Sequence, residues 1–170
     1  MRYFIASDIH GSAYWCRRML DAFSDCGADR LVLLGDILYH GPRNDLPDEY
    51  SPKAVIAMLS PLAKRILSVR GNCEAEVDQM VLPFPTMADY AVIDRGDFLV
   101  YLTHGHLCSP DRLPPLRAGD VFISGHTHVP IDEVREGVRC LNPGSVSIPK
   151  EGSAHGCLVL DEEGFKRVTL

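Results

Sequence analysis

Two histidines stand one residue apart in the stretch VFISGHTHVP, which runs from Val121 to Pro130. His126 and His128 follow an apolar run that ends in a glycine, a pattern typical of a strand end. One interpretation is a solvated turn that happens to contain histidine. The other is a metal site, because imidazole is the commonest metal ligand among protein side chains. Two imidazoles delivered together at a strand end would suit a pair of neighbouring ions.

Other metal-binding side chains follow four further strand-like runs. In chain order they are Asp8 and His10, then Asp36, then Asn72, then His104. Each alone is more often a surface turn or a capping carboxylate. Ligands of open α/β sheets, however, bind beyond the carboxyl ends of the strands. With His106, five of the seven histidines fall in these clusters, and the combination predicts one ligand site at one edge of one sheet.

The donor types narrow the choice of metal. Imidazole, carboxylate and amide oxygen, without thiolate, favour Mn, Fe, Zn, Co or Ni over a thiolate site or an all-oxygen calcium site. Seven ligands exceed the needs of one tetrahedral ion. They fit two ions that share a carboxylate and keep open positions for water and substrate. This arrangement predicts a hydrolase.

The elements that must position these residues alternate between strand and helix in the first half. A helix begins at Ser12 as N-cap and ends at Gly27, and a second opens at Ser51 and Pro52, with Pro61 near its end. Strand, helix, strand, helix, strand predicts a parallel sheet built by crossovers. The strands expected here are 2–7, 30–36 and 65–72.

The second half is predicted to be mostly strand. Three hairpins are expected, with turns at 95–97, near Gly137 and near Gly164, and one further strand at 120–125. The polar, proline-rich stretch 38–52 is too long for an idle connection, which makes it a candidate lid or substrate loop.

Composition limits the classes of protein. The 170 residues, 46% of them hydrophobic, suit one domain over 1–170 with a substantial core. A net charge of -6 with scattered basic residues provides no stripe for extended nucleic acid. Six separated cysteines without a C-x-x-C pair or a secretory signal predict reduced thiols in a cytoplasmic protein. No apolar run approaches the roughly 18 residues of a membrane span.

The ordered motifs D-x-H, G-D, G-N, T-H-G-H and G-H-T-H resemble those of the calcineurin-like metallophosphoesterases. The segments GDILYHGPRNDLP, VRGNCEAEVDQM, LTHGHL and LNPGSVSIPK are similar to the bacterial YfcE-type phosphodiesterases of that superfamily. The resemblance covers nearly the whole chain. It implies an α/β fold, a four-layer α/β/β/α sandwich of two mixed β-sheets.

The resemblance also implies a ligand assignment and an activity. Two divalent ions, with Mn preferred, would share Asp36 as the bridge. The activity would be hydrolysis of small phosphodiesters by a hydroxide that bridges the two ions. One ion would be held by Asp8, His10, Asp36 and His128, and the other by Asp36, Asn72, His104 and His126.

One position departs from the superfamily pattern. Many members carry histidine after the G-N asparagine, where it acts on the transition state or the leaving group, but this chain has Cys73. A thiol with a reference pKa of about 8.5 suits that role poorly. We therefore interpret Cys73 as biasing activity toward diesters or activated leaving groups; a packing cysteine is the alternative.

Further candidates complete the expected site. Asn72, Cys73 and His106 are the candidate catalytic residues, although His106 could equally hydrogen-bond a carbonyl. Arg43 and Asn44 are candidate substrate-binding residues, because a guanidinium complements phosphate oxygens; a solvated loop arginine is the alternative.

Three residues near the third strand have two interpretations each. Arg70 would touch substrate or brace the site through a carboxylate. Glu74 and Asp78 would support the metal ligands or begin a helix.

The apolar stretch 81–87 is a candidate subunit contact of a homo-oligomer or a packed loop.

Two other functions stay open on the same fold. A noncatalytic protein-interaction module, as in the retromer subunit of this architecture, predicts eroded ligands, and none is eroded here. A nucleotide or cyclic-nucleotide phosphodiesterase, or a phosphatase, would use the same ligand set.

Overall fold

The first of two β-sheets is built by the crossovers that the alternating pattern predicts. The computed structural model describes residues 1–170, and in it β1 (Tyr3–Ala6), β2 (Arg30–Leu33) and β3 (Ile66–Ser68) pair in parallel. The antiparallel strands β9 (Gly156–Asp161) and β10 (Gly164–Thr169) extend this sheet beyond β1, in the order β10-β9-β1-β2-β3. The sheet is therefore mixed.

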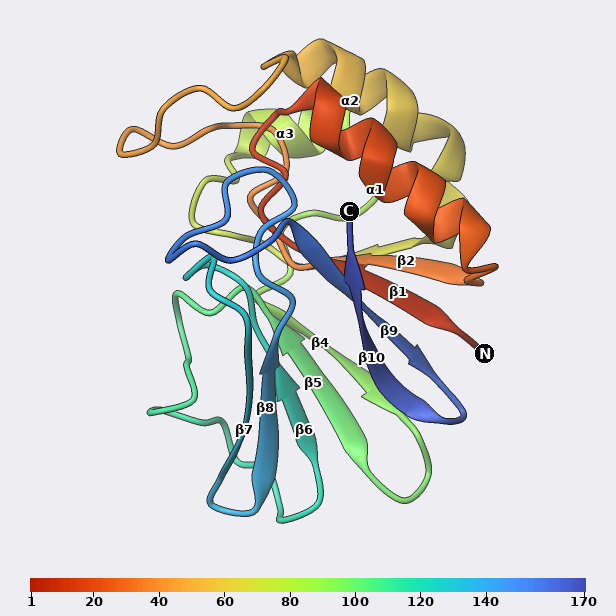
Figure 1. The fold of residues 1–170 in the computed structure, drawn as a ribbon, viewed down its shortest axis with the longest axis vertical. Helices are drawn as coiled ribbons and strands as arrows, with labels where there is room; N and C mark the ends of the chain where they lie inside the picture. The colour runs from red at the N-terminus through yellow and green to blue at the C-terminus, as the bar shows by residue number, and fades with distance from the viewer.

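The helices lie together over the outer face of this first sheet (Figure 1). The helix α1 (Ala13–Asp25) begins as predicted, with the Ser12 hydroxyl accepting the N–H of Trp15. The helix α2 (Pro52–Leu59) ends earlier than expected and continues as the 3-10 helix η1 (Ser60–Arg65). Pro61 explains the change, because it has no N–H for an α-helical hydrogen bond. The short α3 (Glu76–Val81) follows.

The second sheet contains the hairpins of the second half. Its order is β4-β5-β6-β8-β7, in which β5 (Leu99–Thr103), β6 (Val121–Ile123) and β8 (Val138–Asn142) are parallel. The edge strands β4 (Tyr90–Asp94) and β7 (Ile131–Arg135) are antiparallel to their neighbours. The predicted architecture of two mixed sheets is confirmed.

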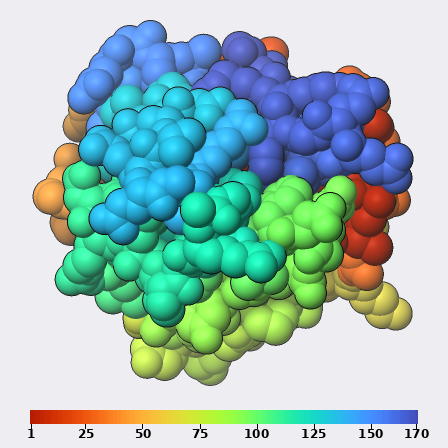
Figure 2. Space-filling model, turned by 90° about the horizontal axis from the view of Figure 1, so that it is seen from below, coloured from red at the N-terminus to blue at the C-terminus, as the bar shows by residue number.

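A shared core holds the two sheets face to face. Ile5 and Val32 of the first sheet belong to the same buried cluster as Leu102, Ile123 and Leu141 of the second. Alternate residues of the second sheet face outward, as the period of a strand requires. The view from below in Figure 2 shows a surface made mostly by the second half of the chain, drawn in green to blue.

The outer face of the second sheet is covered by an irregular segment, 104–120, with no helix. Leu113 and Leu116 of this segment pack against Phe122 on that face. The helical layer is thus confined to the first sheet, and the fourth layer is a loop. None of the helices is long and apolar enough to cross a membrane.

The apolar stretch 81–87 is mostly a packed segment. Leu82 and Phe84 are buried in the core beneath the helices. Val81 is half exposed, and its neighbour Met80 in α3 is exposed. The packed-loop interpretation therefore accounts for Leu82 and Phe84.

Candidate metal centre

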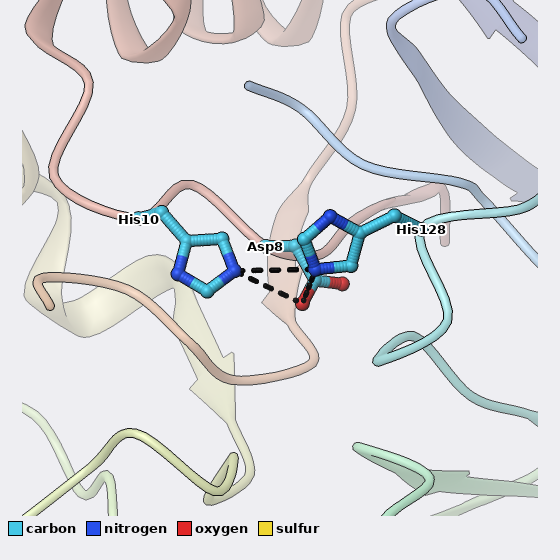
Figure 3. A group of neighbouring side chains, drawn as sticks. All are labelled: Asp8, His10 and His128. Atoms are coloured by element: carbon cyan, nitrogen blue, oxygen red, sulfur yellow. Dashed lines mark hydrogen bonds and ion pairs between the residues drawn. The ribbon is translucent and has the colours of Figure 1, made fainter. Parts of the chain in front are cut away.

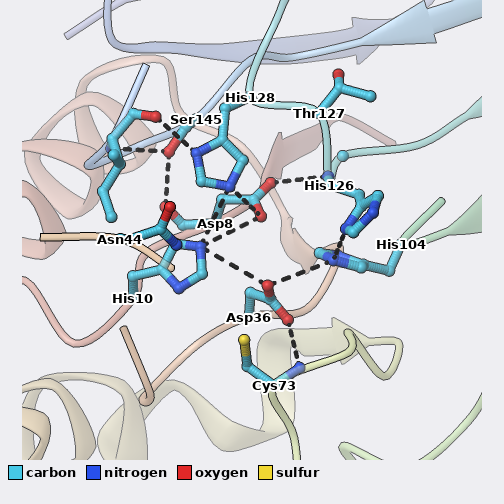
Figure 4. A network of polar contacts seen from close by, with 12 residues as sticks. Asp8, His10, Asp36, Asn44, Cys73, His104, His126, Thr127, His128 and Ser145 are labelled. Atoms are coloured by element: carbon cyan, nitrogen blue, oxygen red, sulfur yellow. Dashed lines mark hydrogen bonds and ion pairs between the residues drawn. The ribbon is translucent and has the colours of Figure 1, made fainter. Parts of the chain in front are cut away.

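The predicted ligands lie at strand ends of two sheets, so the expectation of one sheet edge is wrong. Asp8, Asp36 and Asn72 follow β1, β2 and β3 of the first sheet, whereas His104 and His126 follow β5 and β6 of the second. Because the sheets pack face to face with these ends adjacent, the two groups of side chains converge (Figure 4). The single site is therefore a product of sheet packing.

Sharp backbone turns aim most of these side chains inward. Eight non-glycine residues have a positive φ, a region that side chains with a Cβ rarely adopt. Five of the eight are predicted ligands, namely Asp8, His10, Asp36, His126 and His128. Backbone strain of this kind is typically concentrated at functional sites. The local chain is thus held in an unfavourable shape where chemistry is expected.

The first group of donors consists of Asp8, His10 and His128, which point toward one another (Figure 3). Asp8 Oδ1 lies 3.2 Å from His128 Nε2 and 3.6 Å from His10 Nε2. The two Nε2 atoms are 3.2 Å apart. All three side chains are buried.

The second group is arranged around His104. Its Nε2 lies 3.0 Å from Asn72 Oδ1, 3.2 Å from His126 Nδ1 and 3.4 Å from Asp36 Oδ2. Asp36 Oδ2 is also 3.7 Å from His10 Nε2 of the first group. Asp36 therefore lies between the two groups, where a bridging carboxylate would be needed.

The hydrogen bonds of the imidazoles test whether these residues fit metal ions. Nδ1 of His10, His104 and His128 faces a backbone carbonyl, Tyr39 O at 2.8 Å, Leu34 O at 2.7 Å and Ile148 O at 2.6 Å, respectively. A carbonyl only accepts, so Nδ1 carries a proton in each ring, and Nε2 is the nitrogen that faces the centre and can bind a metal ion once it is unprotonated.

Without a cation this arrangement is unfavourable. With both Nε2 atoms unprotonated, the lone pairs of His10 and His128 meet at 3.2 Å, and Asp8 Oδ1 is buried with no hydrogen-bond partner; a proton or a metal ion relieves this. A cation among these atoms satisfies all of them. The donor set therefore fits divalent metal ions.

The charges of the centre also favour cations. Burial raises the pKa of Asp8, but contacts with His10 and His128 outweigh it and hold that pKa well below the ordinary value. Asp36 behaves similarly: burial raises its pKa, and the opposing contact with His104 lowers it overall. Burial lowers the pKa of His104, yet Asp36 and Asp8 raise it to about 9. Both carboxylates are thus ionised at neutral pH.

Glu74 braces the backbone of two turns that carry predicted ligands. Its carboxylate accepts the N–H groups of Asp36 at 2.8 Å, Ile37 at 2.7 Å and Gly71. Burial, and then the charge of Asp36, raises its pKa to about 7. Of its two interpretations, the structure favours support of the ligands, because Glu74 ties the turn after β2 to the turn after β3.

Asp78 and Arg70 take the other roles. The Asp78 carboxylate accepts the N–H of Ala75 at 2.7 Å and so begins α3. Arg70 pairs with Asp89 at 2.7 Å and braces the segment beside the site. Neither residue lines the cavity over the predicted ligands.

A cavity of about 350 Å³ opens over the predicted ligands. Arg43, Asn44, Asn72 and Cys73 line it, as the sequence led us to expect. Sequence reasoning missed Lys150, although it lies at the end of the quoted segment LNPGSVSIPK. The full lining is Asp36, Gly41, Pro42, Arg43, Asn44, Asn72, Cys73, His126, Thr127, His128 and Lys150.

His106 is not part of this cavity. It lines a neighbouring hollow of about 260 Å³, together with Cys108 and Arg112. Its Nδ1 is buried and has no hydrogen-bond partner, and burial together with His104 lowers its pKa. The alternative of a hydrogen bond from this nitrogen to a carbonyl is therefore not realised.

Cys73 lies beside the ligands and is partly buried. Its N–H donates to Asp36 Oδ1 at 2.9 Å, and its Sγ accepts from Asn72 Nδ2 at 3.4 Å. Burial and the charge of Asp36 raise the pKa of the thiol. The sulfur thus faces the cavity as a protonated thiol.

The serines of the segment LNPGSVSIPK were also missed. The hydroxyls of Ser145 and Ser147 donate to the backbone carbonyl of Asp8, at 2.9 and 3.0 Å. They hold the strained turn after β1. No local signal marks them, because their partner is more than a hundred residues away.

The geometry agrees with comparisons to known proteins. The family model described as the calcineurin-like phosphoesterase superfamily domain matches residues 1–164. The chain belongs to this superfamily. Within it, the phosphodiesterase YfcE of Escherichia coli strain K12 is 45% identical over 170 residues, which cover 100% of this chain and 92% of that protein.

Two solved structures share the fold. The structure of YfcE, described as a phosphoesterase from E. coli, superposes with a TM-score of 0.95 at 43% identity and covers 99% of both chains. A structure described as a novel archaeal phosphodiesterase has a TM-score of 0.71 at 21% identity, with 100% of both chains covered, and shows the fold alone. The resemblance inferred from the motifs is confirmed.

Proposed function

We propose that this chain, acting as one domain over residues 1–170, is a metal-dependent phosphodiesterase of small phosphodiesters. The proposal rests on one observation: two clusters of imidazole and carboxylate side chains meet at Asp36, which lines an open cavity. A volume of about 350 Å³ suits a small substrate. The family and the phosphodiesterase name of its E. coli relative support the same activity.

We assign the ligands of two divalent ions from these contacts. Asp36 would bridge them, because its Oδ2 forms close contacts with a histidine of each group, 3.7 Å from His10 Nε2 and 3.4 Å from His104 Nε2. One ion would be held by Asp8, His10, Asp36 and His128, and the other by Asp36, Asn72, His104 and His126.

We propose Mn²⁺ as the working metal, because the set combines carboxylate and amide oxygens with imidazole and does not require a thiolate. Fe, Zn, Co and Ni are the alternatives that a reconstitution series would compare. All six cysteines are unpaired, which supports a reducing, cytoplasmic setting.

The chemistry follows from what each group can do. Bound divalent ions lower the pKa of water and polarise phosphoryl oxygens. The carbonyl bonds to His10, His104 and His128 keep the imidazoles oriented so that no reorganisation is needed during reaction. Arg43 and Asn44 on the cavity wall bind the phosphate group or its substituent.

Cys73 sets the preference among esters. A thiol replaces the imidazole poorly as a general acid, because its reference pKa of about 8.5 suits proton donation badly at neutral pH and nearby bound cations would favour its ionised form. Diesters with stable leaving groups, such as phenolates, should therefore react best. His106, which faces the neighbouring hollow, acts on the chemistry only through His104 and His126, whose ring centroids lie 5.4 and 6.3 Å away.

The test is hydrolysis of bis-p-nitrophenyl phosphate beside p-nitrophenyl phosphate, with added manganese and after chelation. Both release the same phenolate, so the ratio of rates isolates the preference for the diester. We expect chelator-sensitive turnover that favours the diester. Asp36→Asn should abolish it, whereas Asp21→Asn on the exposed surface of α1 should not. Full activity of folded Asp36→Asn, or turnover unaffected by chelation, would contradict the proposal.

A further inference from the structure

Two cationic side chains line the cavity from different loops. Arg43 lies in the loop before α2, and Lys150 lies in the loop between β8 and β9. Both loops project on the same side of the molecule, in orange and in blue at the left of Figure 1. Because both residues line one cavity, a single ligand can reach both.

Neither cation has a partner in the protein. The side chains of Arg43 and Lys150 are exposed and make no hydrogen bond or ion pair, although the backbone N–H of Lys150 donates to His128 O at 3.2 Å. Arginines elsewhere are used differently, for example Arg139, which pairs with Asp132 at 2.8 Å. The cavity charges are therefore free to bind a ligand.

The charge of the wall is opposite to that of the chain. The chain carries a net charge of -6, yet the only carboxylate of the lining is Asp36, which is assigned to the metal ions. Apart from these ligands, every charged group of the wall is positive. Such a patch concentrates anions at the cavity.

The rest of the lining does not suit an apolar substituent. Only one of its 11 residues is hydrophobic, and no phenylalanine, tyrosine or tryptophan is among them. Pockets for aromatic or aliphatic groups are lined mainly by such side chains. The cavity therefore offers little to a nucleobase or a hydrocarbon arm and more to a polar one.

Charge balance then points to a second anion on the substrate. Of the four positive charges of two divalent ions, Asp8, Asp36 and a bridging hydroxide would balance three, and the single negative charge of a phosphodiester would balance the fourth. Arg43 and Lys150 add further positive charge beyond them. We propose that the substrate is a phosphodiester with a small polar ester arm that carries a second anionic group, and that Arg43 and Lys150 bind this group. The inference rests on the proposed function.

The first experiment compares p-nitrophenyl diesters that differ only in their second arm: ethyl, 2-methoxyethyl, 2-carboxyethyl and 2-phosphonooxyethyl. All release p-nitrophenolate, so differences in kcat/KM report the arm. We expect the anionic arms to exceed the neutral arms by about tenfold, as charge-assisted hydrogen bonds allow. The last two arms distinguish a carboxylate from a phosphate as the preferred anion.

Variants locate the preference. In Lys150→Ala the ratio of anionic to neutral kcat/KM should fall toward one, mainly through KM. Lys53→Ala is the matched control, because Lys53 is exposed on α2 and lies outside the cavity; it should leave the ratio unchanged. High salt should also reduce the preference of the wild type, since exposed charges are screened.

Binding provides a readout that does not depend on turnover. The products ethyl phosphate and 2-carboxyethyl phosphate are titrated calorimetrically into the manganese-loaded enzyme. We expect the carboxylate-bearing product to bind about tenfold more tightly, and Lys150→Ala to remove the difference.

The outcomes separate the two proposals. If no diester is hydrolysed under any metal condition, the proposed function fails, and this inference fails with it. If all four diesters are hydrolysed equally, or the ethyl diester is preferred, phosphodiesterase activity stands and the second anion is refuted. A preference that survives in Lys150→Ala would refute the role of Lys150.

Discussion

Metal binding should displace a proton from His104. Asp36 and Asp8 raise its pKa to about 9, so at about pH 7.5 the metal-free protein carries nearly one proton there. A metal ligand must be unprotonated, and binding therefore releases about one proton from this residue. The apparent metal affinity should rise up to about tenfold per pH unit below pH ~9 and level off above it.

The same pKa makes the stability of the metal-free protein depend on pH. The folded pKa of His104 lies above its unfolded value of about 6.5. Its contribution is therefore fully present below pH ~6.5 and is lost as pH rises through about 9. At about 1.4 kcal/mol per unit of pKa difference, the free energy of unfolding should fall by roughly 3 kcal/mol over this range.

Calorimetric titration of manganese in buffers of different ionisation enthalpy measures the released protons, and urea unfolding at a series of pH values measures the stability. His104→Asn should reduce both the proton release and the pH dependence between pH ~6.5 and ~9. Proton release near zero at about pH 7.5, together with a flat stability profile, would show that His104 is neutral in the metal-free protein and that its pairing with Asp36 is weak.

Three further substitutions test how the site is held. Glu74→Ala leaves three backbone N–H groups without their acceptor and should lower the free energy of unfolding by about 2 kcal/mol in urea melts. Glu76 is exposed in the first turn of α3, so Glu76→Ala should lower it by less than about 1 kcal/mol. Equal effects of the two substitutions would contradict the bracing role of Glu74. Gly125→Ala would place a Cβ 1.9 Å from the Ser7 hydroxyl oxygen, so we expect a loss of about 1–3 kcal/mol and weaker manganese binding by calorimetry; wild-type values for both would show that the close approach is absent. Asn142→Ala removes the amide that donates to Gly125 O at 2.7 Å and to the Thr127 hydroxyl in the turn after β6. It should lower the free energy of unfolding by about 2 kcal/mol, measured by thermal unfolding. An unchanged Tm would contradict this expectation.

Local patterns in the sequence predicted most elements. The N-cap at Ser12, the glycine stop at Gly27 and the three hairpin turns lie where expected, because each depends on the chemistry of a few adjacent residues. The early end of α2 was missed because the apolar pattern continues past Pro61. Whether a helix ends at such a proline depends on its packing, which the sequence does not show. The short α3 has too few residues for a clear period.

The candidate ligands could also be named from the sequence, since aspartate, asparagine and histidine bind metals wherever the fold brings them together. Tertiary structure alone decided that they come from two sheets, because the meeting of β1 and β2 with β5 and β6 depends on the packing of a core shared by distant segments. It also fixed which imidazole nitrogen faces the centre, because the carbonyls that orient the rings are distant in the sequence, as Leu34 is from His104. Tertiary structure also decided that Lys150 lines the cavity. The position of a loop residue depends on how distant segments pack, and a short stretch of sequence does not determine it.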